Sequence, residues 1–237
     1  MPLEVLAVAA HPDDAEITCG GTLIKLAARG RRVGVLDLTA GEMGTRGSAE
    51  ERLREAAAAA QVMGLAVREN LGLKDSALDL TTANKLAIAA VIRRHRPRMV
   101  ILPLKDQQRH PDHRAAAILG YEACFLAGLA KADLEGEPFR PHKIIYASSF
   151  IETGHSFMVD ISDHWECKHQ AVAAYRSQFD GAPQSREIFR PGNDIFEFME
   201  IYQRKYGIEV GCRYAEAFWM AEPMLVDDPS LLPVRSI

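Results

Sequence analysis

Histidine and aspartate side chains are concentrated in two short segments of this 237-residue sequence, residues 10–16 and residues 106–113. The first reads Ala-His-Pro-Asp-Asp-Ala-Glu and the second Asp-Gln-Gln-Arg-His-Pro-Asp-His. Zinc favours nitrogen and oxygen ligands in a tetrahedral arrangement, and a catalytic site uses three protein ligands and leaves one position for water. His11, Asp14 and one histidine of the second segment satisfy this count. We therefore expect one metal site to which both segments contribute.

The other acidic and imidazole groups of these segments suit hydrolysis of an amide. A metal lowers the pKa of its bound water, but a nearby base must still receive the proton, and Asp13 suits that role. The tetrahedral oxyanion that forms from an amide also needs a positioned donor, which His110 could supply. Asp112 would then orient His110 by accepting its other ring N–H.

Both segments directly follow predicted strands. Residues 3–10 and 99–103 are strongly apolar runs that end in polar turns. In open α/β sheets, ligands bind in the crevice at the carboxyl ends of the strands. Two clusters at equivalent strand ends can therefore converge on one site.

Alternating strand and helix patterns over the first 150 residues predict right-handed βαβ units. We therefore expect a Rossmann-like α/β fold, a mostly parallel sheet with helices on both faces, as a single domain over residues 1–237. Ser48, three residues before Glu51, resembles a capping box that opens a helix. The predicted strands are 3–10, 33–38, 67–71, 99–103, 143–150 and one near 213–219, and the predicted helices are 20–29, 49–63, 82–95, 112–130, 162–176 and 195–206.

Composition narrows the class of partner. The formal net charge is -4 and the pI is near 6.1, which argues against a nucleic-acid-binding surface. No apolar run approaches the ~20 residues of a membrane-spanning helix, and the amino terminus lacks a basic region before its apolar run. We expect a cytoplasmic protein that acts on a small molecule. Its four cysteines contain no C-x-x-C pair and are expected to be free thiols.

The two segments together resemble the LmbE-like, or PIG-L, family of zinc-dependent N-acetylglucosamine deacetylases. The motifs that carry the resemblance are Ala-His-Pro-Asp-Asp and His-Pro-Asp-His. The chain departs from many members in having Ala15 between the second aspartate and Glu16, which leaves Glu16 without an assigned role. The resemblance implies zinc ligands at His11, Asp14 and His113, a general base at Asp13, and an oxyanion-stabilising residue at His110.

Further stretches are similar to the bacillithiol-pathway branch of that family: residues 41–47, 52–56, 175–179 and 214–218. This similarity implies removal of acetate from N-acetyl-α-glucosaminyl L-malate. It also implies sugar contacts at Arg52 and Asp75, although a helix-surface arginine and a turn aspartate are equally compatible with the sequence. Lys143 could meet the malate carboxylate, although a lysine at the start of a strand is usually only solvated.

Related deacetylases form homo-oligomers, and the resemblance implies the same assembly here. The apolar segment Phe196-Glu197-Phe198-Met199 could supply an interface. Large apolar residues are more often part of the core, so packing of this segment inside the monomer is an equal expectation.

Three other functions are compatible with parts of the sequence. A deacetylase of another amino sugar, such as a chitooligosaccharide or an antibiotic precursor, would carry the same motifs. A dinucleotide-binding protein would need G-x-G-x-x-G in the first βα turn, where this chain has His-Pro-Asp-Asp. A non-catalytic sugar- or metal-binding module would have no use for Asp13, so the presence of that residue favours an enzyme.

Overall fold

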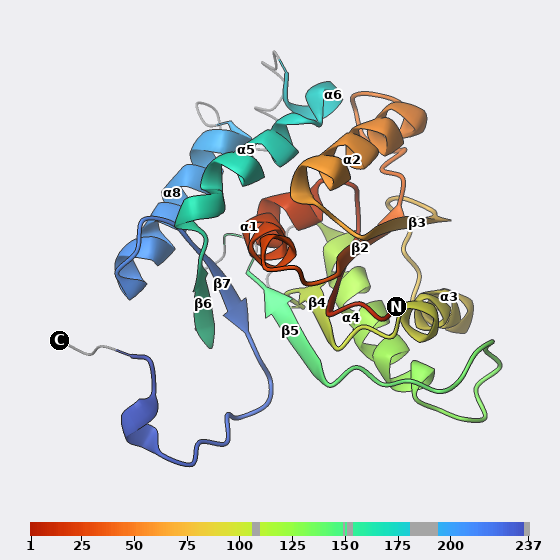
Figure 1. Cartoon of the computed structure of the whole chain (residues 1–237). Coiled ribbons are helices and arrows are strands. Elements are labelled where there is room, and N and C mark those ends of the chain that lie inside the picture. The colour runs from red at the N-terminus through yellow and green to blue at the C-terminus, as the bar shows by residue number, and fades with distance from the viewer. Residues whose placement is uncertain (106–109, 149, 151–153, 181–193, 235–237) are drawn as a thin grey trace.

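One seven-stranded sheet organises the computed structural model, which describes residues 1–105, 110–148, 150, 154–180 and 194–234 (Figure 1). The strand order is β3-β2-β1-β4-β5-β7-β6. The first five strands in this order are parallel, and β7 runs antiparallel to both β5 and β6. The strands are β1 Val5–Ala9, β2 Val33–Thr39, β3 Val67–Leu73, β4 Met99–Pro103, β5 Lys143–Ala147, β6 Phe157–Asp160 and β7 Ala215–Trp219. The predicted mostly parallel α/β architecture is confirmed.

Helices cover both faces of this sheet. On one face α3 and α4 pack on the strands, and on the other α1, α2 and α5 do. The helices are α1 Asp14–Ala28, α2 Ala49–Met63, α3 Thr82–His95, α4 Pro111–Ala127, α5 Trp165–Ala173, α6 Arg176–Phe179 and α8 Ile195–Val210, with short 3-10 turns η1 Ser162–His164 and η2 Pro229–Leu231.

Strand β1 is apolar throughout because both of its faces are buried. Leu6 and Val8 belong to the core cluster beneath α3 and α4, whereas Val5 and Ala7 belong to the cluster beneath α1. All five residues of β1 are buried. A strand buried on both faces cannot alternate polar and apolar side chains, so it reads as a continuous apolar run.

Helix α1 begins earlier than the sequence predicts. It starts at Asp14, directly after the histidine motif, rather than at Gly20-Gly21. Both glycines lie inside the helix, and at Gly21 the segment before η1 approaches closely, so that a Cβ there would lie 2.8 Å from Ile161. In contrast, α2 has the bounds and the capping box at Ser48 and Glu51 that the sequence predicts.

The carboxyl-terminal part of the chain adds two features to the expected order. Strand β6, which was not predicted, forms the edge of the sheet beside β7. The apolar segment 196–199 lies in α8, where Met199 is buried and Phe198 packs against Phe150 and Tyr202 with ring centroids 5.2 and 4.8 Å apart. These side chains therefore have partners within the same chain. After β7 the chain leaves the body (Figure 1).

Candidate metal and catalytic site

The carboxyl ends of β1 and β4 bring the two motif segments together. His11 follows β1, and His110 precedes α4 after β4. β1 and β4 are neighbours, and the chain leaves β1 toward β2 on the opposite side, so a crevice forms between their ends. The rings of His11, His110 and His113 have centroids 4.7 to 5.4 Å apart.

Asp14 lies between two of these histidines. Its Oδ1 is 3.1 Å from His113 Nε2, and its Oδ2 is 3.4 Å from His11 Nδ1. Burial alone would raise the pKa of Asp14, but the positive charge of His113 and hydrogen bonds from both imidazoles hold it well below the ordinary value. The three residues therefore present two ring nitrogens around an ionised carboxylate.

The other ring nitrogen of His11 faces two further carboxylates. Nε2 is 3.0 Å from Asp75 Oδ1 and 3.5 Å from Asp112 Oδ2. When a metal replaces the proton on Nδ1, the carboxylate at Nε2 would hold the remaining proton on Nε2 and leave Nδ1, beside Asp14, free to act as a ligand. Asp75 is itself buried and also accepts from the Met43 backbone N–H across 2.9 Å. The structure thus places Asp75, predicted to contact sugar, behind His11.

Two groups of side chains in the described ranges have possible ligand atoms that all lie within 4.8 Å of one another, and neither contains Asp14. One contains the three histidines, and the other contains His11, Asp75 and Asp112. The second would need the nitrogen of His11 that Asp75 occupies. The set of His11, Asp14 and His113, joined through the two oxygens of Asp14, leaves the contact between His11 and Asp75 intact.

The charge around His11 suits a cation. Burial lowers the pKa of His11, but hydrogen bonds and charges from Asp14 and Asp75 outweigh burial and raise it to about 10. The surrounding carboxylates thus hold a positive charge at this position, either a proton or a metal ion. Nitrogen and carboxylate oxygen are also the donor types that zinc accepts.

His110 is oriented by the start of α4. It is the N-cap residue, and its Nδ1 accepts a hydrogen bond from the backbone N–H of Asp112 across 3.2 Å. Since an accepting nitrogen carries no proton, the neutral ring carries its proton on Nε2. Burial and the positive charges of His11 and His113 lower the pKa of His110, which favours the neutral form. His110 can therefore donate a hydrogen bond from Nε2.

The side chain of Asp112 does not make the contact with His110 that the sequence predicts. Its Oδ2 accepts from the Ser76 backbone N–H across 2.7 Å, and its Oδ1 accepts from that of Leu78 across 3.4 Å. The backbone of residue 112, rather than its carboxylate, contacts His110. The prediction that the Asp112 carboxylate contacts the His110 ring is therefore wrong. The carboxylate instead accepts hydrogen bonds from backbone N–H groups of the segment after β3.

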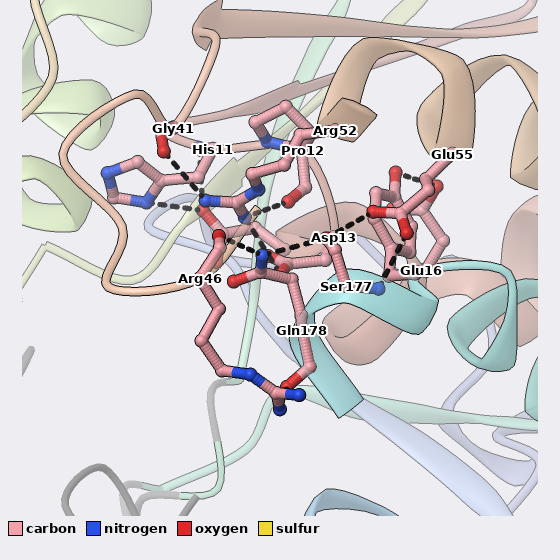
Figure 2. Close-up of polar contacts among 12 residues, drawn as sticks. His11, Pro12, Asp13, Glu16, Gly41, Arg46, Arg52, Glu55, Ser177 and Gln178 are labelled. Carbon is pink, nitrogen blue, oxygen red and sulfur yellow. Dashed lines mark hydrogen bonds and ion pairs between the residues drawn. The ribbon is translucent and has the colours of Figure 1, made fainter. Parts of the chain in front are cut away.

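Asp13 forms a buried ion pair with Arg52 of α2. Arg52 Nη2 donates to Asp13 Oδ2 across 2.9 Å (Figure 2). The guanidinium also donates to the Pro12 carbonyl across 2.7 Å and to the Gly41 carbonyl across 3.2 Å. Arg52, predicted to contact sugar, is thus buried and engaged with the turn that carries Asp13.

Two properties of Asp13 set it apart from a turn residue. Its φ of 107° lies in a region that L-residues rarely adopt, and such strain often occurs at functional sites. Burial raises the pKa of Asp13 to about 7, although the positive charge of Arg52 opposes the rise. A carboxyl group with a pKa near neutrality is well matched to general base catalysis.

Comparison with known proteins is consistent with this geometry. The family model described as PIG-L, GlcNAc-PI de-N-acetylase, matches residues 6–124. The diacetylchitobiose deacetylase of Thermococcus kodakarensis is 36% identical to the chain over 229 residues, which cover 90% of the chain and 81% of that protein. The chain belongs to the PIG-L family.

Two solved structures extend the comparison. The conserved protein TT1542 from Thermus thermophilus is 43% identical, with a TM-score of 0.84 over 94% of this chain and 97% of its own. The 4-carboxy-2-hydroxymuconate hydratase from Pseudomonas putida is 21% identical, with a TM-score of 0.78 over 96% of this chain and 99% of its own. The latter likeness concerns the fold alone, so assignment of the reaction must rest on the site.

In this PIG-L family member, the loop of residues 41–47 closes over Asp75 and is held by α6. Glu42 Oε1 accepts from the Asp75 backbone N–H across 2.8 Å. Gln178 Nε2 donates to the Arg46 carbonyl across 2.7 Å, and Arg46 Nη1 donates back to the Gln178 carbonyl across 3.1 Å (Figure 2). The sequence offered no physical signal for this clasp, because its two sides lie 132 positions apart.

Glu16 faces away from the histidines into a buried ion network. It pairs with Arg68 of β3, which also contacts Asp37 through two hydrogen bonds of 2.8 and 3.0 Å. Tyr175 Oη donates to Glu16 Oε1 across 3.0 Å. Glu16 thus connects the first turn of α1 to β2, to β3 and to Tyr175, which lies between α5 and α6.

The suggestion that Lys143 meets a substrate carboxylate is wrong. Lys143 begins β5 and pairs in register with Met99, the first residue of β4. It therefore lies at the amino-terminal edge of the sheet, opposite the edge that carries the histidines.

No helix among the described residues is long and apolar enough to cross a membrane.

Proposed function

We propose that this chain is a metal-dependent deacetylase that hydrolyses the acetamide group of an N-acetylglucosamine-type sugar. The observation that carries the proposal is the placement of Asp14 between His11 and His113, with Asp13 and His110 at the same crevice. Family membership supports the same reaction, since the matching family model is that of a sugar de-N-acetylase.

His11, Asp14 and His113 would hold the metal, and zinc suits this donor set. When bound, such an ion polarises the amide carbonyl and lowers the pKa of a coordinated water. Asp75 would keep His11 in the required tautomer through their 3.0 Å contact.

The remaining residues have separate tasks in the reaction. Asp13 would accept a proton from the attacking water and pass it to the amide nitrogen as the C–N bond breaks. His110 would donate its Nε2–H to the oxygen that becomes negatively charged when water adds to the carbonyl. One amide and one water thereby give a free amine and acetate. Arg52 would keep Asp13 aimed at the crevice.

Two substrates are supported by specific observations. The segments 41–47, 52–56, 175–179 and 214–218 favour N-acetyl-α-glucosaminyl L-malate through their likeness to the bacillithiol branch. The relative from Thermococcus kodakarensis favours diacetylchitobiose. Both carry the acetamide on the second carbon of glucosamine, so the same catalytic residues would serve either.

A release assay would test the reaction and the substrate together. The metal-loaded protein is incubated with the malate glycoside, diacetylchitobiose and N-acetylglucosamine, and free amine and acetate are quantified in parallel. We expect equal amounts of both products and the highest kcat/KM for the malate glycoside. A preference for diacetylchitobiose would select the second substrate, and no acetate from any N-acetylated sugar would refute the deacetylase.

A further inference from the structure

The loop of residues 41–47 is fixed by hydrogen bonds rather than by burial. Five of its seven residues are exposed, and Gly41 alone is fully inside. One backbone hydrogen bond closes the turn within it, from the Gly44 N–H to the Gly41 carbonyl across 3.1 Å. A segment with so little apolar packing is held only as firmly as its polar contacts allow. The partners of those polar groups therefore decide where the loop lies.

On its inner side the loop supports the residue that orients His11. The Met43 N–H donates to Asp75 Oδ2 across 2.9 Å, and the Glu42 carboxylate accepts from the Asp75 backbone N–H across 2.8 Å. The other oxygen of Asp75 lies 3.0 Å from Nε2 of His11. A displacement of the loop would therefore move the carboxylate that orients a candidate metal ligand.

The first residue of the loop contacts the neighbour of the candidate base. The Gly41 carbonyl accepts from Arg52 Nη1 across 3.2 Å, and a Cβ at Gly41 would collide with the same guanidinium. Arg52 pairs in turn with Asp13 across 2.9 Å. The loop thus lies between the two groups that support the site.

On its outer side the loop is held by α6. Gln178 Nε2 donates to the Arg46 carbonyl across 2.7 Å, and the Arg46 guanidinium donates to the carbonyls of Gln178 and Asp180 across 3.1 and 2.8 Å (Figure 2). A Cβ at Gly47 would lie 2.7 Å from Ser177 Oγ, so the loop and α6 are in direct contact.

Helix α6 is itself anchored to the body of the protein. The backbone N–H and the hydroxyl of Ser177 both donate to Glu55 of α2, each across 2.6 Å (Figure 2). Tyr175, which directly precedes α6, is fully buried and donates to Glu16 of α1 across 3.0 Å. A helix of one turn has little stability of its own, so these contacts fix its position. The helix can therefore serve as a support for the loop.

We propose that Gln178 is a positioning residue for the candidate metal site. Through its hydrogen bond to the Arg46 carbonyl, it holds the loop of residues 41–47 in the place from which the loop supports Asp75. Asp75 then keeps His11 oriented for the metal. The inference rests on the proposed function, because it explains how that site is kept ready for its ion.

Zinc binding, measured by competition with a chromogenic chelator, tests this role without a substrate. Gln178→Glu keeps the size of the side chain but turns a carboxylate, instead of an amide donor, toward the Arg46 carbonyl. We expect zinc affinity to fall by about 2- to 30-fold, the range for residues that act on a ligand from a distance. The melting temperature of the metal-free protein should be unchanged, because Gln178 is only half-buried.

Arg176→Gln is the matched control. Arg176 is an exposed neighbour on the same helix, and its side chain pairs with Asp180 of its own turn rather than with the loop. The variant should bind zinc as the wild type does. A second variant, Gly47→Ala, places a Cβ against Ser177 and so pushes the loop away from α6 while Gln178 is retained. It should reproduce the loss of zinc affinity, also if Gln178→Glu does not fold.

A double-mutant cycle tests the route through Asp75. Asp75→Asn removes the carboxylate through which the loop reaches His11, so Gln178→Glu should add little further loss in that background. Wild-type zinc affinity in Gln178→Glu or in Gly47→Ala would overturn the proposal. So would a loss from Gln178→Glu that is as large in Asp75→Asn as in the wild type. A wild type that itself binds no zinc would instead refute the proposed function, on which this inference rests.

Discussion

The Arg52 guanidinium and the Asp13 carboxylate form a buried ion pair of 2.9 Å at the start of α1. Because Arg52 is also fixed by the carbonyls of Pro12 and Gly41, it holds the carboxylate in place as well as supplying charge. Burial raises the pKa of Asp13, and the charge of Arg52 opposes that rise. The pair thus sets both the aim and the proton affinity of the candidate base.

Replacing Arg52 should change the pH dependence of the reaction. The base must be ionised, so kcat/KM is expected to rise with pH and to level off above the pKa of Asp13, which is about 7. In Arg52→Gln the opposing positive charge is lost, so the rise should move to higher pH. The control is Arg54→Gln on the exposed face of the same helix. An unchanged profile in Arg52→Gln would show that the pair does not control the base.

Asp13→Asn should separate chemistry from metal retention. The variant keeps the size of the side chain but cannot accept a proton, so kcat should fall by about 10²- to 10⁴-fold, the contribution of a positioned acid-base group. Bound metal, measured by elemental analysis, should equal that of the wild type. Asp79→Asn, at an exposed position, should keep full activity. Full activity in metal-replete Asp13→Asn would remove Asp13 from the mechanism.

The two histidines of the second motif should respond differently to truncation. His110→Ala should retain metal and lower kcat by about 10²- to 10³-fold, with KM less affected, because an oxyanion donor acts mainly in the transition state. His113→Ala should lose metal and activity together. His142→Ala, exposed at the opposite edge of the sheet, serves as the control. Equal metal loss in His110→Ala and His113→Ala would favour the three-histidine set of ligands.

Asp75→Asn should weaken metal binding without removing a ligand. Asp75 holds the Nε2 side of His11, and loss of such a supporting carboxylate typically lowers metal affinity by about 10- to 100-fold. Titration with a chelator would measure the change, and excess metal should restore most of the activity. If affinity is unchanged but KM rises, Asp75 acts on the sugar, as the family resemblance implies.

The buried ion pair between Lys168 and Glu216 should contribute more to stability than an equally short exposed pair. Both side chains are fully buried, and Glu216 also accepts from the backbone N–H groups of Gly21 and Thr22 inside α1. Lys168→Met leaves a buried carboxylate unpaired, so the free energy of unfolding should fall by about 3–5 kcal/mol.

The pair of Lys85 and Glu122 provides the control. Its atoms lie 2.6 Å apart, as in the buried pair, but Glu122 is partly exposed, so Lys85→Met should cost about 0–1 kcal/mol. Urea unfolding of both variants gives the comparison. Similar losses would indicate that Glu216 finds another partner.

Sequence patterns predicted those parts of the fold that depend only on residues close together in the sequence. The capping box at Ser48 and the apolar run of β1 depend on neighbouring residues, and both could be predicted from the sequence. The start of α1 could not, because Gly20 and Gly21 indicate a break unless their packing partner is known. For Gly21 that partner is Ile161, which lies 140 positions further along the chain.

In the candidate site, too, the residue types could be predicted from the sequence, but the contacts between distant segments could not. Donor chemistry grouped His11, Asp14 and one histidine of the second segment, and the family resemblance implied that this histidine is His113. The structure places the three side chains together. The sequence did not reveal that Arg52 contacts Asp13 or that the Asp112 carboxylate contacts the segment after β3. Those contacts depend on which side chains and backbone groups face one another once the elements have packed, and no local sequence pattern predicts this.

The left-handed backbone at Asp13 is a local strain that the ion pair with Arg52 outweighs. Holding an L-residue at φ of 107° costs on the order of 1–3 kcal/mol, which a glycine at the same position would avoid. The same glycine would leave the buried Arg52 guanidinium without its carboxylate partner, which typically costs about 3–5 kcal/mol. Relief of the strain therefore does not by itself make the fold more durable, because the bent turn and the cation that grips it are stable only as a unit.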